Sequence, residues 1–295
     1  MERDTLPSLP GRRSLLRAVG AGIALSVLPG KPGWAGANPL RIGLTPVFLD
    51  DQVSFVARWR TWLEQRLGRP VNFVQRGNYR DIVDLLRQGK LDFAWICGYP
   101  YVRHRADFKL VAVPLWRGQP TYRAYLIVPR GDTASRGILD LRGRVFAYAD
   151  PDSNSGFLYP QYLLTKAREG KTPFFGRTFF TWAHRKVVEA VAIGLAAGGA
   201  VDGYVWEVMD ELFPALTRDT RVMHRSEPFG YPPFVARADL PEAEVEAFRR
   251  ALMGMAADAS GAALLGRIRL DGFTLAGPGL YDGIDRMRRI LPARS

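Results

Sequence analysis

Apolar positions along the chain alternate between short runs and helical spacing, and this alternation predicts an α/β protein. Residues 40–44, 71–74 and 91–96 form short apolar runs, which predict strands. Between these runs, apolar side chains recur every three or four residues at 53–67 and 79–86, which predicts two helices. This β-α-β-α-β order indicates a parallel sheet whose strands are joined by crossover helices.

The pattern changes after residue 109. Strands predicted at 110–115 and 122–128 follow each other with no helix between them, as expected where a chain crosses into a second lobe. A second α/β set begins at 145–148 and continues with a helix after Ser155, a strand at 179–182, a helix from His184 to about Leu195 and a strand at 201–205. A returning crossover at 231–235 and a helix opened by Pro241 complete the pattern.

The expected fold class is therefore α/β with two lobes, each a mixed, mostly parallel sheet flanked by helices. Two crossover strands would hinge the lobes. The expected boundaries place residues 38–122 and 232–295 in lobe 1 and residues 123–231 in lobe 2. Because ligands of open α/β sheets bind beyond the carboxyl ends of the strands, we expect a binding site between the lobes.

The first 37 residues carry the pattern of an export signal. Arg12 and Arg13 precede a mild apolar stretch at 18–28, and a small-x-small cleavage site follows at 35–37. The apolar stretch is about half of the ~20 residues that a helix needs to cross a bilayer, so we expect no stable membrane insertion. The pattern predicts a twin-arginine signal peptide, residues 1–37, and a mature periplasmic protein that begins near Asn38.

Composition narrows the classes of function. The 295-residue chain has a net charge of +12, but its basic residues are scattered with no run of five, which argues against nucleic acid as a partner. Cys97 is the single cysteine, so an intrachain disulfide and a multi-cysteine metal site are excluded. The motifs G-x-S-x-G, H-E-x-x-H and C-x-x-C are absent, and a P-loop-like segment at 169–172 lacks its first glycine. We expect a monomeric binding protein without cofactor or metal, not an enzyme.

The segment between the strand at 145–148 and the following helix carries the strongest candidate chemistry. Ser153, Asn154 and Ser155 precede Gly156, so hydroxyls, an amide and free backbone N–H groups gather at a helix start. Together with the positive end of the helix dipole, these groups suit an oxyanion. An ordinary helix N-cap turn would show the same residues.

Two further segments follow predicted strands. Cys97 and Tyr99 lie in an expected loop after the strand at 91–96, where a lone cysteine is more often a small buried apolar residue. His184 opens a helix, while Trp206 and Glu207 follow the strand at 201–205. The histidine could donate to an oxyanion or simply cap its helix. A Cys97–His184 nucleophile and base would need an orienting group that the sequence does not place.

From about residue 40 to residue 255 the chain resembles the phosphate/phosphite/phosphonate-binding proteins of ABC importers, the PhnD-like group with a type II periplasmic binding fold. The resemblance rests on Leu-Arg-Ile-Gly at 40–43, Asn-Tyr at 78–79, Asp-Phe-Ala-Trp at 92–95, Asp-Ser-Asn-Ser-Gly-Phe at 152–157, His184 and Val-Asp at 201–202. It implies capture of a small oxyanion for an ABC transporter permease.

The resemblance also implies a ligand-binding set. The family's loop, tyrosines and histidine correspond to Ser153, Asn154, Ser155, Tyr79, Tyr122 and His184, with Asn154 where the family usually has threonine. Glu207 corresponds to one carboxylate that binds an aminoalkyl ammonium, whereas the second position carries Tyr231, which favours a smaller oxyanion. The candidate ligand-binding residues are Tyr79, Cys97, Tyr99, Tyr122, Ser153, Asn154, Ser155, His184, Trp206, Glu207 and Tyr231.

A related branch supplies an alternative. The chain is also similar to binding proteins of this superfamily that sense arsenite through one cysteine and act on a membrane histidine kinase. Cys97 would then bind arsenite covalently as a thiolate.

Overall fold

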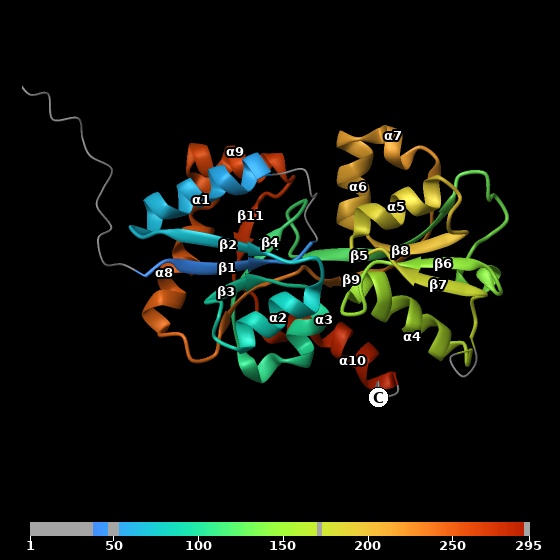
Figure 1. The fold of residues 1–295 in the computed structure, drawn as a ribbon, viewed down its shortest axis with the longest axis horizontal. Helices are drawn as coiled ribbons and strands as arrows, with labels where there is room; N and C mark the ends of the chain where they lie inside the picture. Colours follow the sequence, from blue (N-terminus) through green and yellow to red (C-terminus); the bar gives the residue numbers. More distant parts are fainter. Residues whose placement is uncertain (1–37, 47–52, 170–172, 292–295) are drawn as a thin grey trace, which may run out of the picture. The chain divides into compact units, whose positions relative to one another are not determined.

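A computed structural model describes residues 38–46, 53–169 and 173–291, so the expected signal peptide lies outside the described residues. One mixed sheet has the strand order β11-β4-β10-β3-β1-β2, and Figure 1 shows its strands β2, β1 and β3 side by side. Its strands are β1 (Leu40–Leu44), β2 (Val71–Gln75), β3 (Phe93–Trp95), β4 (Phe108–Leu115), β10 (Phe234–Arg237) and β11 (Gly272–Thr274). β1 pairs in parallel with β2 and β3, as the β-α-β-α-β pattern predicts.

Six helices accompany this sheet in the described part of the chain: α1 (Val53–Leu67), α2 (Tyr79–Arg87), α3 (Gly98–Arg103), α8 (Glu242–Met253), α9 (Ala259–Arg267) and α10 (Asp282–Ile290). α2 begins at Tyr79 because the Asn78 side chain accepts a hydrogen bond from the Asp81 N–H and so caps the helix. α2 lies close against β1, since a Cβ on Gly43 would stand 2.8 Å from Ile82 Cγ2. The start of α2 is thereby fixed beside the strand ends.

The second sheet has the order β7-β6-β8-β5-β9 (Figure 1). Its strands are β5 (Thr121–Pro129), β6 (Val145–Tyr148), β7 (Arg177–Phe180), β8 (Gly198–Asp202) and β9 (Thr220–Gly230), with helices α4 (Tyr159–Lys166), α5 (His184–Ala192), α6 (Gly203–Leu212) and α7 (Pro214–Thr217). Single turns of tighter helix occur at Arg105–Asp107, Ile138–Leu141, Met255–Ala257 and Pro278–Tyr281. The chain passes between the sheets from β4 to β5 and again from β9 to β10.

Several predicted details were wrong. Parallel pairs do not predominate, because β10 and β11 in the first sheet and β5 and β9 in the second pair antiparallel with their neighbours. β5 and β10, the strands by which the chain enters each sheet after a crossing, run opposite to the strands beside them, and β11 adds a third antiparallel pair at the edge of the first sheet. Residues 98–103 form helix α3, not a loop. The strand expected at 201–205 ends at Asp202, because the Asp202 carboxylate caps α6 by accepting from the Tyr204 and Val205 N–H groups.

Within the described residues, no helix is both long enough and apolar enough to cross a membrane.

Candidate functional site

The Ser153–Ser155 segment lies where β6 gives way to α4. It forms the start of a π-helical turn, Asn154–Leu158, and Ser153 caps that turn by accepting from the Gly156 N–H at 3.0 Å. Glycine is needed at position 156, since a Cβ there would stand 2.5 Å from Ala149 Cβ and 3.1 Å from His184 Cε1. All three polar residues are buried, with at most 1% of each exposed. Burial makes their hydrogen bonds costly to leave unmade.

Asn154 joins this turn to two other segments. Its backbone N–H donates to Cys97 Sγ at 3.3 Å, and its side-chain Nδ2 donates to the Tyr122 hydroxyl at 2.9 Å. Cys97 directly precedes α3, and Tyr122 lies on β5. Cys97 and Tyr122, which lie 57 and 32 positions before Asn154 in the sequence, thus both contact this one residue.

His184 holds the turn from the side of α5. The Asp202 backbone N–H donates to His184 Nδ1 at 3.1 Å, so the ring proton of the neutral imidazole resides on Nε2. Nε2 faces the Tyr79 hydroxyl at 3.2 Å and Ser153 Oγ at 3.5 Å. Complete burial lowers the His184 pKa to about 3, so the imidazole is neutral near pH 7. His184 therefore acts as a neutral donor and a link between Tyr79 and Ser153, not as a cation.

Three buried polar atoms in this region have no hydrogen-bond partner of acceptable geometry among the residues that the structure describes: Asn154 Oδ1, Ser155 Oγ and the Tyr231 hydroxyl. Tyr231 lies beside the same cluster, with its ring centroid 5.9 Å from that of Tyr122. An unpaired buried polar group costs about 1–3 kcal/mol. The Ser155 hydroxyl also interacts with that of Tyr122, and the Tyr231 hydroxyl with that of Tyr204, so Asn154 Oδ1 is the atom of the three with no partner of any kind among the described residues. Buried polar atoms left without well-formed hydrogen bonds in one region are typical of a site whose ligand supplies the missing partners.

Cys97 is a buried neutral thiol. Burial raises its pKa to about 12, although hydrogen bonds from the Asn154 and Tyr99 backbones act in the opposite direction. Its sulfur accepts a hydrogen bond from the Asn154 backbone N–H and so holds the start of the turn. The Tyr99 ring, by contrast, packs under the Arg103 guanidinium at 5.6 Å on the same helix, and no hydrogen bond to another described residue places its hydroxyl among the buried groups.

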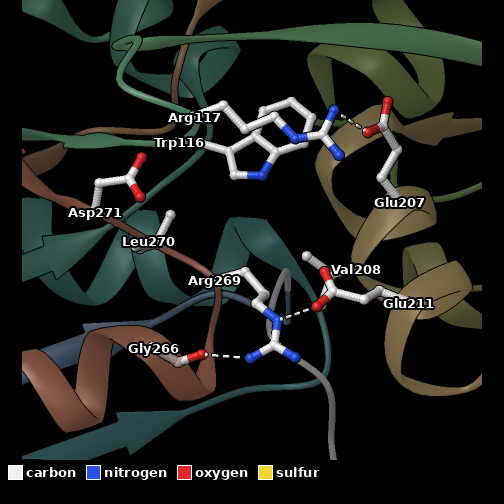
Figure 2. Close-up of a pocket in the computed structure, with 9 residues that line it drawn as sticks. All are labelled: Trp116, Arg117, Glu207, Val208, Glu211, Gly266, Arg269, Leu270 and Asp271. Carbon is white, nitrogen blue, oxygen red and sulfur yellow. Dashed lines mark hydrogen bonds and ion pairs between the residues drawn. The ribbon is translucent and has the colours of Figure 1, made fainter.

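Two predicted ligand residues lie in other surroundings. The Glu207 carboxylate forms an ion pair with Arg117 at 2.5 Å and also accepts from the Tyr125 hydroxyl. As Figure 2 shows, Glu207 lines a separate pocket of about 320 Å³ together with Arg117, Glu211 and Arg269. Trp206 donates from Nε1 to Thr220 Oγ1 at 3.1 Å. Both residues lie on α6, which begins one residue after β8 ends and carries them away from the turn.

Three buried carboxylates near the turn were not among the predicted ligand residues. Asp150 accepts from the Tyr79 N–H at 3.0 Å, and Asp152 forms ion pairs with Arg80 at 3.3 Å and Arg103 at 2.7 Å. Asp202 is fully buried, and burial raises its pKa to about 7. The Asp-Gly step at 202–203 after an apolar strand is a helix-cap signal that could have identified Asp202 from the sequence.

Comparison with known proteins identifies the family. Residues 42–281 match the family described as the periplasmic substrate-binding protein of phosphonate ABC transporters. The "Phosphate-import protein PhnD" of Mycolicibacterium smegmatis is 31% identical over 159 residues, which are 50% of this chain and 48% of that protein. The chain thus aligns with about half the length of this curated relative.

Solved structures show the same fold. A binding protein component of an ABC phosphonate transporter from Pseudomonas aeruginosa aligns with a TM-score of 0.78 at 21% identity, covering 85% of this chain and 86% of that one. PhnD1 from Prochlorococcus marinus, solved with methylphosphonate, aligns with a TM-score of 0.76 at 20% identity, covering 85% and 97%.

These likenesses confirm the predicted type II periplasmic binding fold. The match over residues 42–281 to a family of substrate-binding transport proteins confirms the expectation that the chain is not an enzyme. Because residues 42–281 match the family model and the fold agrees, the chain belongs to the family of periplasmic substrate-binding proteins of phosphonate ABC transporters.

Proposed function

We propose that this protein captures a small phosphonate- or phosphate-type oxyanion at the Ser153–Ser155 turn and delivers it to the permease of an ABC importer. The observation that carries the proposal is a pair of buried polar atoms without a well-formed hydrogen bond, Asn154 Oδ1 and Ser155 Oγ, at the start of a helical turn. The Tyr231 hydroxyl is a third such atom, and its ring packs against that of Tyr122. The family match and the methylphosphonate complex of the Prochlorococcus protein support this ligand class.

The proposed ligand set contains Tyr79, Tyr122, Ser153, Asn154, Ser155, His184 and Tyr231. Tyr79 belongs to α2 beside the first sheet, whereas His184 belongs to α5 beside the second, and their side chains meet at 3.2 Å. We propose that residues 38–122 and 232–295 form one lobe and 123–231 the other, and that the Tyr79–His184 contact forms when the lobes close on the ligand. The protein would work as a periplasmic monomer after export by the twin-arginine route.

The arsenite-sensing alternative is not favoured. Arsenite capture needs a reactive thiolate, but burial raises the Cys97 pKa to about 12 and its sulfur already accepts the Asn154 N–H. An aminoalkyl phosphonate is also disfavoured, because Glu207 is engaged by Arg117 and Tyr125.

A ligand panel tests the proposal. Phosphate, phosphite, methylphosphonate, 2-aminoethylphosphonate, sulfate, arsenate and arsenite would be added singly in thermal-shift measurements. A ligand at about 100 times its Kd adds about 2.7 kcal/mol to the free energy of unfolding. We expect stabilisation by at least one phosphorus oxyanion, and the recovered ligand should be chemically unchanged. No stabilisation by any of them would refute the function.

Serine variants locate the site. Ser153→Ala and Ser155→Ala each remove a hydroxyl that would bind a charged ligand, worth about 1.5–3 kcal/mol, so affinity should fall tenfold or more. Ser135→Ala is the matched control, because Ser135 is equally buried but its hydroxyl donates to Asp132. That control should lose stability and keep its affinity. If all three variants bind the ligand as tightly as the parent protein, the turn serves only as a helix cap.

A further inference from the structure

We propose that the site selects the singly protonated, monoanionic form of its oxyanion, with Asn154 Oδ1 accepting the ligand's hydrogen. This inference rests on the proposed function and specifies the chemical form of the ligand. It predicts that phosphorus oxyanions bind and that fully ionised anions such as sulfate do not.

The first ground is the free acceptor on Asn154. One N–H of the amide nitrogen Nδ2 donates to the Tyr122 hydroxyl at 2.9 Å, and the backbone N–H donates to Cys97 Sγ at 3.3 Å. Oδ1 is buried and has no partner among the described residues. A carbonyl oxygen accepts hydrogen bonds and repels an ionised oxygen. An O–H of the ligand satisfies it, whereas a bare anionic oxygen does not.

The second ground is the absence of a free cation within the described part of the site. The remaining groups that face the ligand region are neutral near pH 7: the Tyr79, Tyr122 and Tyr231 hydroxyls, the Cys97 thiol and the His184 imidazole. Burial raises the tyrosine pKa values well above 10 and lowers that of His184. The neighbouring Tyr204 hydroxyl is also neutral and donates to the Ile268 carbonyl. The donors are therefore dipoles, which stabilise one negative charge better than two.

The third ground is the balance of the charged neighbours. The carboxyl groups are Asp150, Asp152 and Asp202, and the cations are Arg80 and Arg103, both of which pair with Asp152. Asp150 and Asp202 act electrostatically on Tyr79, and Asp202 also acts on Tyr122 and Tyr231. The net charge of these five side chains is −1 when Asp202 is ionised and zero when Asp202 is protonated. With Asp202 ionised, each additional charge on the ligand therefore meets net repulsion, because both arginines are already balanced by carboxylates.

Ligand chemistry turns these grounds into a selectivity. The second ionisation of a phosphate monoester occurs near pH 6, so such oxyanions interconvert between monoanion and dianion around neutrality, and the monoanion predominates at pH 5. Sulfate carries none in this range. The site should therefore distinguish two tetrahedral anions of similar size by one hydrogen.

The test is the affinity for methylphosphonate from pH 5 to pH 9, measured by isothermal titration calorimetry alongside sulfate. We expect Kd to rise roughly tenfold per pH unit above the second ionisation of methylphosphonate, because the binding form declines by that factor. Sulfate should not bind at any pH. A Kd that stays constant across this range, or sulfate binding of comparable strength, would overturn the inference and leave oxyanion capture intact.

Two variants test whether the pH dependence comes from the ligand proton accepted by Asn154 or from a proton on Asp202. Asn154→Thr replaces the free acceptor with a hydroxyl that can donate, so its pH dependence should flatten and sulfate affinity should appear. Asn72→Thr, an exposed amide on β2, is the matched control and should behave as the parent protein. Asp202→Asn keeps a capping side chain for α6 but cannot ionise. Retention of the pH dependence in this variant is expected, and its loss would assign the proton to Asp202 and overturn the inference.

Methylphosphonate binding at pH 5 separates the two levels of failure. If the protein binds neither methylphosphonate nor phosphate nor phosphite at pH 5, the proposed function itself is refuted.

Discussion

Replacement of Cys97 is the perturbation that separates oxyanion capture from arsenite sensing. The thiol is 3% exposed, and its sulfur accepts the Asn154 backbone N–H at 3.3 Å. Cys97→Ser retains an acceptor at this position and adds a more polar group to a buried site, at a cost of about 1–2 kcal/mol of stability. Cys97→Ala leaves the Asn154 N–H unpaired, which adds about 1–3 kcal/mol to the packing loss. The alanine variant should therefore be the less stable of the two.

Binding should follow the position of Asn154 and not the presence of sulfur. Cys97→Ser keeps the turn in place, so its Kd for methylphosphonate should stay within about threefold, or ~0.7 kcal/mol, of the parent. Cys97→Ala should bind about tenfold more weakly, because the unpaired amide lets the turn shift. Calorimetry gives both values, and circular dichroism shows whether each variant is folded.

The alkylation rate of the Cys97 thiol provides an independent test. A pKa of about 12 leaves roughly one thiol in 10⁵ ionised at pH 7, against a few per cent for an ordinary cysteine. Alkylation of the native protein by iodoacetamide should thus be slower than that of the urea-unfolded chain by a factor of about a thousand or more. Rapid alkylation that arsenite blocks, together with loss of all oxyanion binding in folded Cys97→Ser, would refute the reasoning.

Three other outcomes follow from the described contacts and the N-terminal sequence. Below pH 6.5 the unfolded chain binds a proton on His184, whereas the folded chain binds it only near pH 3. The free energy of unfolding of the parent, relative to that of His184→Gln, should therefore fall as pH falls through this window, by up to about 1.4 kcal/mol per pH unit. Urea unfolding at pH 4–7 measures this slope, and an equal pH dependence in the two proteins would contradict the buried neutral ring. Glu207→Gln weakens an ion pair whose other partner, Arg117, is exposed, and such a pair is worth at most about 1 kcal/mol. Calorimetry should therefore show equal losses of affinity, less than about fivefold, for methylphosphonate and 2-aminoethylphosphonate, and a selective loss of the amino compound would restore Glu207 to the ligand set. Changing Arg12 and Arg13 to lysine should prevent export, as followed by cell fractionation, and normal periplasmic accumulation would exclude the twin-arginine route.

Much of the local structure follows from the sequence because its causes are local. The apolar spacing of α2 and its Asn78 cap act within one turn, and Gly68 and Gly89 take the left-handed conformation just past the ends of α1 and α2. The Ser153–Ser155 turn was identified for the same reason, since its hydroxyls and Gly156 act within one helical turn.

Only the tertiary structure decided which distant side chains meet. β5 lies between β8 and β9, and this order, set by the two crossings of the chain, brings Tyr122 to the Asn154 amide. The proton position on His184 depends on a backbone N–H 18 residues away, which no periodicity encodes. Glu207 follows the same strand as the buried Asp202, yet the direction of α6 pairs it with Arg117 instead. Spacing along a chain determines helices and strands, whereas a binding site depends on how those elements pack.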